Sequence, residues 1–315
     1  MIEYFQVVDK KLKKLDEIQP GCWVNIQPPI ESGETKAFAK EMDIELDFLM
    51  DSLDKDERSR YEREEDVRLI LVNAPTLNDS APENESLYLT IPIGIILTPD
   101  NVITISSHKK TVLKRFLKMK VKGFKPEVQQ KFVLLIFEQI VRDYLHCLKL
   151  LNQKRNEIEK ELYDSSRNQE LRRLLSIEKS LVYFVNSLSA NDLLKMKMKR
   201  TDFLEMRNDE VLTDLFEDII IDNGQALEMS NVYTNILNGT MEAYASIISN
   251  NLNMVIQRLT LVTIILMVPT LVASLYGMNV PLPFKNSEYS FYFIIVFSIS
   301  VSLLLAWFFR RHRLF

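Results

Sequence analysis

The chain has 315 residues, 47% of them hydrophobic, and its 39 Lys and Arg against 43 Asp and Glu give a formal net charge of −4. No strongly basic domain is implied, so nucleic acid is not expected as a partner. Two cysteines, Cys22 and Cys147, and three histidines lie too far apart along the chain to predict a tetrahedral zinc site. The N-terminus lacks an apolar run of signal-peptide length, so we expect the N-terminal region to stay in the cytosol.

Short apolar runs alternate with helical patterns through residues 1–122, which predicts an α+β cytosolic domain. We expect one helix over 35–52 and strands at 22–26, 67–72, 86–97 and 102–106. The sequence of this region carries neither a glycine-rich phosphate loop nor a nucleophile elbow. We therefore predict a protein that is not an enzyme and needs no organic cofactor.

Long helices with few breakers follow the first domain. Residues 123–200 predict a helical hairpin, with one helix from Pro126 to about Tyr163 and a second from Asn168 to 187–190 or slightly beyond. Glu and Lys dominate their polar faces, as in a solvated hairpin. A third helix is expected to begin between 201 and 209 and to continue unbroken into a membrane, with 201–258 as its cytosolic part.

Two stretches without charge lie near the C-terminus, from Leu259 to about Tyr276 and from Tyr289 to Phe309. A bilayer core of ~30 Å needs about 20 apolar residues in a helix, so each stretch can cross it. We assign the membrane spans to 259–279 and 289–309, with an external loop at 280–288 and a basic cytosolic tail at 310–315.

The positive residues around these spans predict their orientation. Arg258 precedes the first span, the loop holds only Lys285 and Glu288 as charges, and the second span is followed by Arg310, Arg311 and Arg313. Because positive residues stay on the cytosolic side, both termini are expected to be cytoplasmic in a multi-pass protein of the inner (plasma) membrane.

One face of the third helix is unusually polar for a membrane segment. A heptad frame with core positions at Glu242 and Ser246 selects Asn235, Gly239, Glu242, Ser246, Ser249, Asn253, Ile256, Thr260, Thr263, Met267, Thr270, Ser274 and Gly277. Most of these residues are small or polar, which predicts a water-filled pathway at the common axis of identical helices. The alternative interpretation is that small residues only hold helices together in lipid.

The first span ends in Tyr276-Gly277-Met278-Asn279. With this tetrapeptide, two C-terminal helices and a basic C-terminus, the whole chain resembles the CorA family of divalent-cation transporters. Typical members carry Met-Pro-Glu in the following loop, whereas this chain has Val280-Pro281-Leu282-Pro283. The resemblance implies a funnel-shaped homopentamer in the lipid bilayer, whose first membrane helices line one pore for Mg²⁺, with Co²⁺ and Ni²⁺ as further candidate ions. It also implies uptake that the membrane potential drives and intracellular Mg²⁺ stops.

The resemblance and the heptad frame together give the candidate site residues. Gly277, Met278 and Asn279 form the selectivity filter, in which amide and backbone oxygens hold hydrated Mg²⁺ through its water shell. Leu259 and Met267 form a hydrophobic gate, although the frame itself selects Thr260 in place of Leu259. A Cβ at position 277 is expected to crowd the turn. The pore-lining residues are Glu242, Ser249, Asn253, Ile256, Thr263, Thr270 and Ser274.

The resemblance also places a regulatory cation site on the cytosolic part of the third helix. Counted from the family signature, a regulatory Mg²⁺ ligand falls on Asp218, and Asp222 lies four residues later on the same helix face. Two alternatives stay open: a zinc transporter of the same superfamily, whose members usually carry Ile where this chain has Met278, and a membrane-anchored helical scaffold. The choice among Mg²⁺, Co²⁺, Ni²⁺ and Zn²⁺, the second regulatory ligand and proton coupling also stay open, and the subunit number comes from the family alone.

Overall fold

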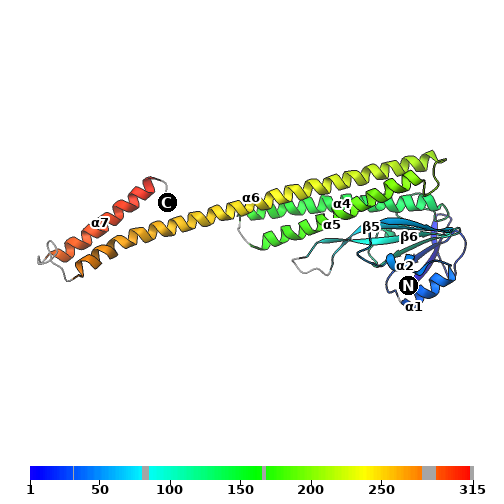
Figure 1. Cartoon of the computed structure of the whole chain (residues 1–315), viewed down its shortest axis with the longest axis horizontal. Helices are drawn as coiled ribbons and strands as arrows, with labels where there is room; N and C mark the ends of the chain where they lie inside the picture. Colours follow the sequence, from blue (N-terminus) through cyan, green and yellow to red (C-terminus); the bar gives the residue numbers. More distant parts are fainter. Residues whose placement is uncertain (31, 80–84, 165–167, 279–288, 313–315) are drawn as a thin grey trace. The chain divides into compact units, whose positions relative to one another are not determined.

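The computed structural model describes residues 1–30, 32–79, 85–164, 168–278 and 289–312 (Figure 1). The chain divides into two compact units, Met1–Thr240 and Met241–Phe315. The described elements are β1 (Ile2–Val8), β2 (Lys11–Leu15), β3 (Trp23–Ile26), α1 (Ser32–Glu41), α2 (Leu46–Asp51), β4 (Arg60–Glu64), β5 (Val67–Leu77), β6 (Tyr88–Leu97), β7 (Val102–Ser106), α3 (Leu113–Leu117), α4 (Gln129–Asp164), α5 (Asn168–Thr201), α6 (Glu210–Tyr276) and α7 (Ser290–Arg311).

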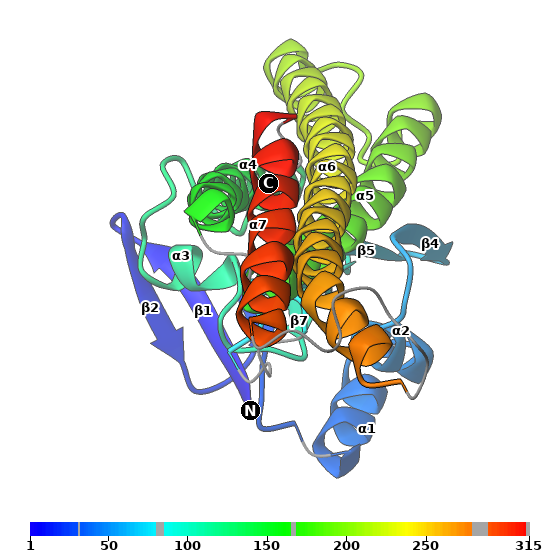
Figure 2. The ribbon, with the colours of Figure 1, turned by 90° about the vertical axis from the view of Figure 1, so that its left-hand side faces the viewer.

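The first unit is built on a seven-stranded mixed sheet in the order β2-β1-β3-β7-β6-β5-β4. Strands β3 and β7 are parallel, and the other neighbouring pairs are antiparallel. Helices α1 and α2 lie on one side of the sheet and α4 and α5 on the other (Figure 2). The expected α+β domain is therefore present.

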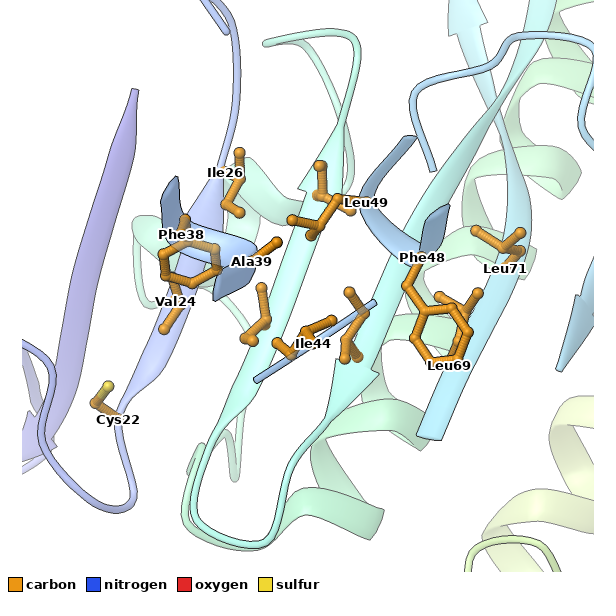
Figure 3. Packing of buried hydrophobic residues seen from close by; sticks show 13 residues of the cluster. Cys22, Val24, Ile26, Phe38, Ala39, Ile44, Phe48, Leu49, Leu69 and Leu71 are labelled. Atoms are coloured by element: carbon orange, nitrogen blue, oxygen red, sulfur yellow. The ribbon is translucent and has the colours of Figure 1, made fainter. Parts of the chain in front are cut away.

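The two-residue period of β3 divides its side chains between the two faces of the sheet. Val24 and Ile26 point to the side of α1 and α2, where Phe38 lies beside Val24 and Phe48 lies beside the strand β5 (Figure 3). Trp23 points to the opposite side and is fully buried. The centre of its ring lies 5.4 Å from that of Phe132 in α4. Side chains of β3 therefore pack against α1 and α2 on one face of the sheet and against α4 on the other.

The strands expected at 22–26 and 102–106 are confirmed as β3 and β7, whereas the single helix expected over 35–52 is wrong. A turn at Asp43, which has a left-handed φ of 53°, separates α1 from α2. The helix break lets α2 approach the sheet closely at Gly94. A Cβ there would lie 1.9 Å from the Ser52 hydroxyl, so only glycine fits beneath the end of α2.

Helix α5 continues to Thr201, past the end expected at 187–190 or slightly beyond, and matches the hairpin expected over 123–200. Polar residues in the second half of α5 form hydrogen bonds with the sheet. Ser187 Oγ donates to Thr90 Oγ1 at 2.8 Å, and Asn191 Nδ2 donates to the Asn73 carbonyl at 2.8 Å. Both acceptors belong to buried strands, so the polar face of α5 is a packed face rather than a helix terminus.

Candidate ion pathway

Two helices of the described chain are long and apolar enough to cross a membrane: α6, through its C-terminal part, and α7 from Phe291 to Arg311. The first helix ends at Tyr276, as expected from the sequence. Arg310 and Arg311 lie in the last turn of α7, and the Arg311 guanidinium lies 5.3 Å from the centre of the Trp307 ring. This pairing of a cation with an aromatic ring is typical of the membrane–water interface.

The expected pore-lining residues all belong to α6 within the second unit, and every one of them is exposed in the single chain: Glu242, Ser249, Asn253, Ile256, Thr263, Thr270 and Ser274. The unbroken helix brings them to one face, because steps of three and four residues return to the same side of a helix. Contacts within one chain therefore leave the polar face open to solvent, to lipid or to another copy.

Threonine hydroxyls on this face donate to the backbone of their own helix. Thr263 Oγ1 donates to the Leu259 carbonyl at 2.8 Å, and Thr270 Oγ1 donates to the Leu266 carbonyl at 3.0 Å. A hydroxyl whose proton is engaged in this way keeps its oxygen lone pairs free. Each threonine therefore presents an acceptor, which suits the water protons around a hydrated cation.

The proposed gate residues are apolar and exposed on the same helix, with 66% of Leu259 and 64% of Met267 accessible. Their side chains make no core in the single chain. Apolar side chains that meet around a narrow axis exclude water from it, whereas the same side chains on the outside of the helices contact lipid.

The end of α6 carries the start of the signature. The Gly277 amide donates to the Ala273 carbonyl at 2.9 Å, and the Met278 amide to the Leu275 carbonyl at 3.2 Å. A Cβ at Gly277 would lie 3.4 Å from the Ala273 carbonyl oxygen, an ordinary contact distance, so the expected crowding is wrong for a single chain. Asn279, the remaining filter residue, lies outside the described residues.

Helix α6 contains Pro269, which the sequence interpretation did not use. Proline has no N–H, so the Ile265 carbonyl, four residues earlier, loses its helical donor. Ser302 of α7 lies against this carbonyl: its Oγ is 3.3 Å from the Ile265 oxygen and 2.9 Å from the Ser298 oxygen on its own helix. The single hydroxyl proton of Ser302 is shared between these two oxygens, with the shorter contact to Ser298, so the second helix compensates the interrupted backbone only in part. The proline within an apolar run was the sequence signal that could have revealed the unpaired carbonyl.

Asp218 and Asp222 are both exposed on α6, in the first unit. Their neighbour Glu217 forms a salt bridge with Lys199 of α5. Among the described residues, no group of three or more His, Cys, Asp and Glu side chains is placed to hold a metal ion. A regulatory cation at Asp218 and Asp222 would therefore need further ligands from another copy of the chain or from water.

A buried lysine joins α5 to the extramembrane part of α6. Lys195 is fully buried, and its Nζ donates to Asn223 Oδ1 at 2.8 Å and lies 5.5 Å from the centre of the Phe137 ring. Asn223 Nδ2 in turn donates to the Leu188 carbonyl at 3.1 Å. Burial lowers the pKa of Lys195 to about 7, and nearby Asp192 opposes this shift. Within one sequence, nothing distinguished Lys195 from the exposed lysines around it.

Comparisons with known proteins agree with this arrangement. A family model described as "CorA-like Mg2+ transporter protein" matches residues 19–311. The cobalt/magnesium transport protein CorA of Methanocaldococcus jannaschii is 29% identical over 308 residues, which cover 95% of this chain and 94% of that protein.

Two solved structures show the same fold. The complete structure of the CorA magnesium transporter from Methanocaldococcus jannaschii superposes with a TM-score of 0.82 at 25% identity and covers 99% of this chain and 98% of that one. The ZntB cytoplasmic domain from Vibrio parahaemolyticus has a TM-score of 0.61 at 11% identity and covers 79% of this chain and 98% of that one. At this low identity the second likeness concerns the fold alone.

Proposed function

Since the chain belongs to the CorA family of divalent-cation transporters, we propose that it forms a channel for Mg²⁺ uptake, with Co²⁺ as a second transported ion. The observation that carries this proposal is the polar face of α6, which contacts within the chain leave open along a membrane-spanning helix. Polar residues are costly in lipid unless they face a water-filled path or a partner.

The channel is a homo-oligomer, a pentamer on the family's pattern, in which the polar faces of identical α6 helices surround one axis. The hydroxyl oxygens of Thr263 and Thr270 then point to hydrated ions in the pore, since their protons are already donated to the helix. Mg²⁺ sheds water reluctantly, so acceptors for its hydration shell suit it better than direct ligands.

Selection takes place at the outer end of the pore, where Gly277, Met278 and Asn279 form the filter. Neutral amide oxygens hold a hydrated divalent ion without the tight binding that a carboxylate ring would give. Leu259 and Met267 form the constriction that stops conduction when it dries. Glu242, Ser249, Asn253, Ile256 and Ser274 line the remaining path.

The driving force is the membrane potential of a plasma membrane in which both termini face the cytosol. Moving two charges inward through 100 mV, negative inside, releases about 4.6 kcal/mol, so transport needs no nucleotide hydrolysis. Arg310 and Arg311, in the last turn of α7, support the cytosolic placement of the C-terminus.

Intracellular Mg²⁺ closes the channel by binding at Asp218 and Asp222, with further ligands from a neighbouring subunit. Two carboxylates four residues apart and exposed on one helix can share a cation across a subunit boundary. Mg²⁺ at this position clamps adjacent subunits in the closed state, and its loss at low cytosolic Mg²⁺ releases them.

Substitution of paired asparagines tests the polar face directly. Asn253 lies on the face and Asn251 lies two residues away, on the opposite side of α6, and both are exposed. In proteoliposomes loaded with a magnesium dye, we expect Asn253→Ala to change Mg²⁺ influx and Asn251→Ala to leave it at the wild-type rate. Asn279→Ala is expected to abolish selective uptake while the oligomer still assembles. Normal influx through both Asn253→Ala and Asn279→Ala would refute the pathway.

A further inference from the structure

Positive charge is concentrated in one segment of the first unit. Between Asp100 and Glu127 the sequence contains no acidic residue and eight basic ones: Lys109, Lys110, Lys114, Arg115, Lys118, Lys120, Lys122 and Lys125. The whole chain carries −4, so this segment of +8 leaves −12 on the remaining residues. Such a local excess of positive charge is suited to attract an anionic ligand.

Five of these basic side chains surround one surface pocket. The pocket has a volume of ≈380 Å³ and its charged lining consists of Lys110, Lys114, Arg115, Lys118, Lys120 and Asp143. The first five come from the loop after β7, from α3 and from the residues that follow it, whereas Asp143 comes from α4. The volume lies within the range of small-ligand sites, which is roughly 300–1,000 Å³.

Two carboxylates neutralise part of this charge. Arg115 forms a salt bridge with Asp143 and donates to Gln139 Oε1 at 3.3 Å, and Lys110 forms a salt bridge with Asp79. Within the described residues, Lys114, Lys118 and Lys120 have no acidic partner. Five cations against two carboxylates leave a net charge of +3 around the pocket.

We propose that this pocket binds a small, multiply charged phosphate anion, such as a free diphosphate or triphosphate group. Ammonium groups bind phosphate as point charges, and a guanidinium adds a planar pair of donors. A net charge of +3 matches the charge of a diphosphate, and Thr111 in the lining adds a hydroxyl donor.

The size of the pocket favours a small ligand over a macromolecule. A volume of ≈380 Å³ holds a di- or triphosphate group, whereas a nucleic acid or a membrane surface cannot enter it. The rest of the chain carries a net charge of −12, so the excess of positive charge is confined to this segment. The site is distinct from the ion pathway, and its test does not depend on transport.

Asp143 limits the affinity of the pocket. Burial raises the pKa of its carboxyl, while the adjacent Arg115 opposes this shift. A carboxylate that occupies Arg115 competes with an incoming phosphate for the same guanidinium. Asp143→Asn is therefore expected to tighten phosphate binding several-fold, because it removes a negative charge and leaves an amide that can still bond to Arg115.

The experiment is calorimetric titration of the full-length protein in detergent with pyrophosphate, without divalent cations, at low and high salt. We expect saturable binding of one pyrophosphate per chain, weakened at least tenfold by Lys114→Glu combined with Lys118→Glu. Both lysines are exposed, so the fold should tolerate the change. The matched control is Lys11→Glu with Lys13→Glu, which reverses two exposed charges on β2, away from the pocket lining, and should bind like wild type.

Three outcomes would overturn the proposal. The first is that wild type binds no pyrophosphate at millimolar concentration. The second is an equal loss of binding in the control on β2, which would mean unspecific attraction by any lysine cluster. The third is that free pyrophosphate does not bind, whereas the wild type binds vesicles that contain a lipid with a phosphate monoester headgroup and the Lys114→Glu, Lys118→Glu variant does not. This result would assign the pocket to a membrane surface.

Discussion

Replacing Lys195 with methionine should change how the stability of the first unit depends on pH. The ammonium is fully buried and donates to Asn223 Oδ1 at 2.8 Å. The difference between its ordinary pKa of 10.5 and about 7 in the fold corresponds to a penalty of about 5 kcal/mol on the charged form. Methionine fills a similar volume without charge but leaves Asn223 Oδ1 unpaired, at a cost of about 1–3 kcal/mol.

The sign of the pH effect follows from proton counting. Between pH 7 and 10.5 the unfolded chain holds the proton on Lys195 and the folded chain does not. Stability therefore rises with pH across this window and is lost as the pH falls toward 7. From pH 6 to pH 9, deprotonation of Lys195 raises the free energy of unfolding of the wild type by about 3 kcal/mol. The Lys195→Met variant lacks this titrating group, so its free energy of unfolding does not rise for this reason. The excess stability of the variant over the wild type should therefore shrink by about 3 kcal/mol between pH 6 and pH 9.

Thermal unfolding of the purified full-length protein in detergent measures this difference, with fluorescence of the buried Trp23 as the reporter of the first unit. For a unit of this size, 1 kcal/mol shifts Tm by about 2–4 °C, so the difference in Tm between variant and wild type should narrow by roughly 6–12 °C from pH 6 to pH 9. The exposed Lys197 provides the control, because Lys197→Met should keep the wild-type pH dependence. Parallel pH curves for Lys195→Met and wild type would refute the reasoning.

Three further predictions concern α6. Ser302→Ala removes the hydroxyl beside the Ile265 carbonyl and should lower stability by about 1 kcal/mol, seen as a lower Tm in detergent that Ser302→Thr restores; unchanged melting of Ser302→Ala would show that the contact contributes nothing. Met267→Ser should raise basal Mg²⁺ flux by wetting the constriction, and a variant that leaks no more than wild type at high internal Mg²⁺ would make Met267 a packing residue. Asp218→Asn with Asp222→Asn should conduct at Mg²⁺ concentrations that silence wild type and lose Mg²⁺ protection against protease, whereas unaltered inhibition would place the sensor elsewhere.

Long, periodic elements were predictable from the sequence because their signal is repeated along the chain. The apolar run before Tyr276 and the basic residues after the second span predict membrane helices that α6 and α7 supply. Strands β3 and β7 were also predicted, since both are short, mostly apolar segments rich in aromatic and β-branched residues. The edge strands β2 and β4 were not, because charged strands such as Lys11–Leu15 lack that pattern. Strand β1, which lies between β2 and β3, was not predicted either.

The parts that sequence reasoning missed depend on pairs of residues far apart in the chain. Pro269 announces an unpaired carbonyl, but its partner could be any hydroxyl of the second span until the structure places Ser302 beside it. Lys195 is one of several lysines near the end of α5, and only packing against Asn223 separates it from them. Such pairings have no period along the sequence, so no pattern within one chain identifies them.

The central claim is tested most directly by electrogenic Mg²⁺ uptake into liposomes that contain the purified wild-type protein. With an imposed potential that is negative inside, we expect influx of Mg²⁺ that grows with the potential, is competed by external Co²⁺ and is absent from protein-free liposomes. Influx no faster than in protein-free liposomes, or influx that ignores the potential, would contradict the account.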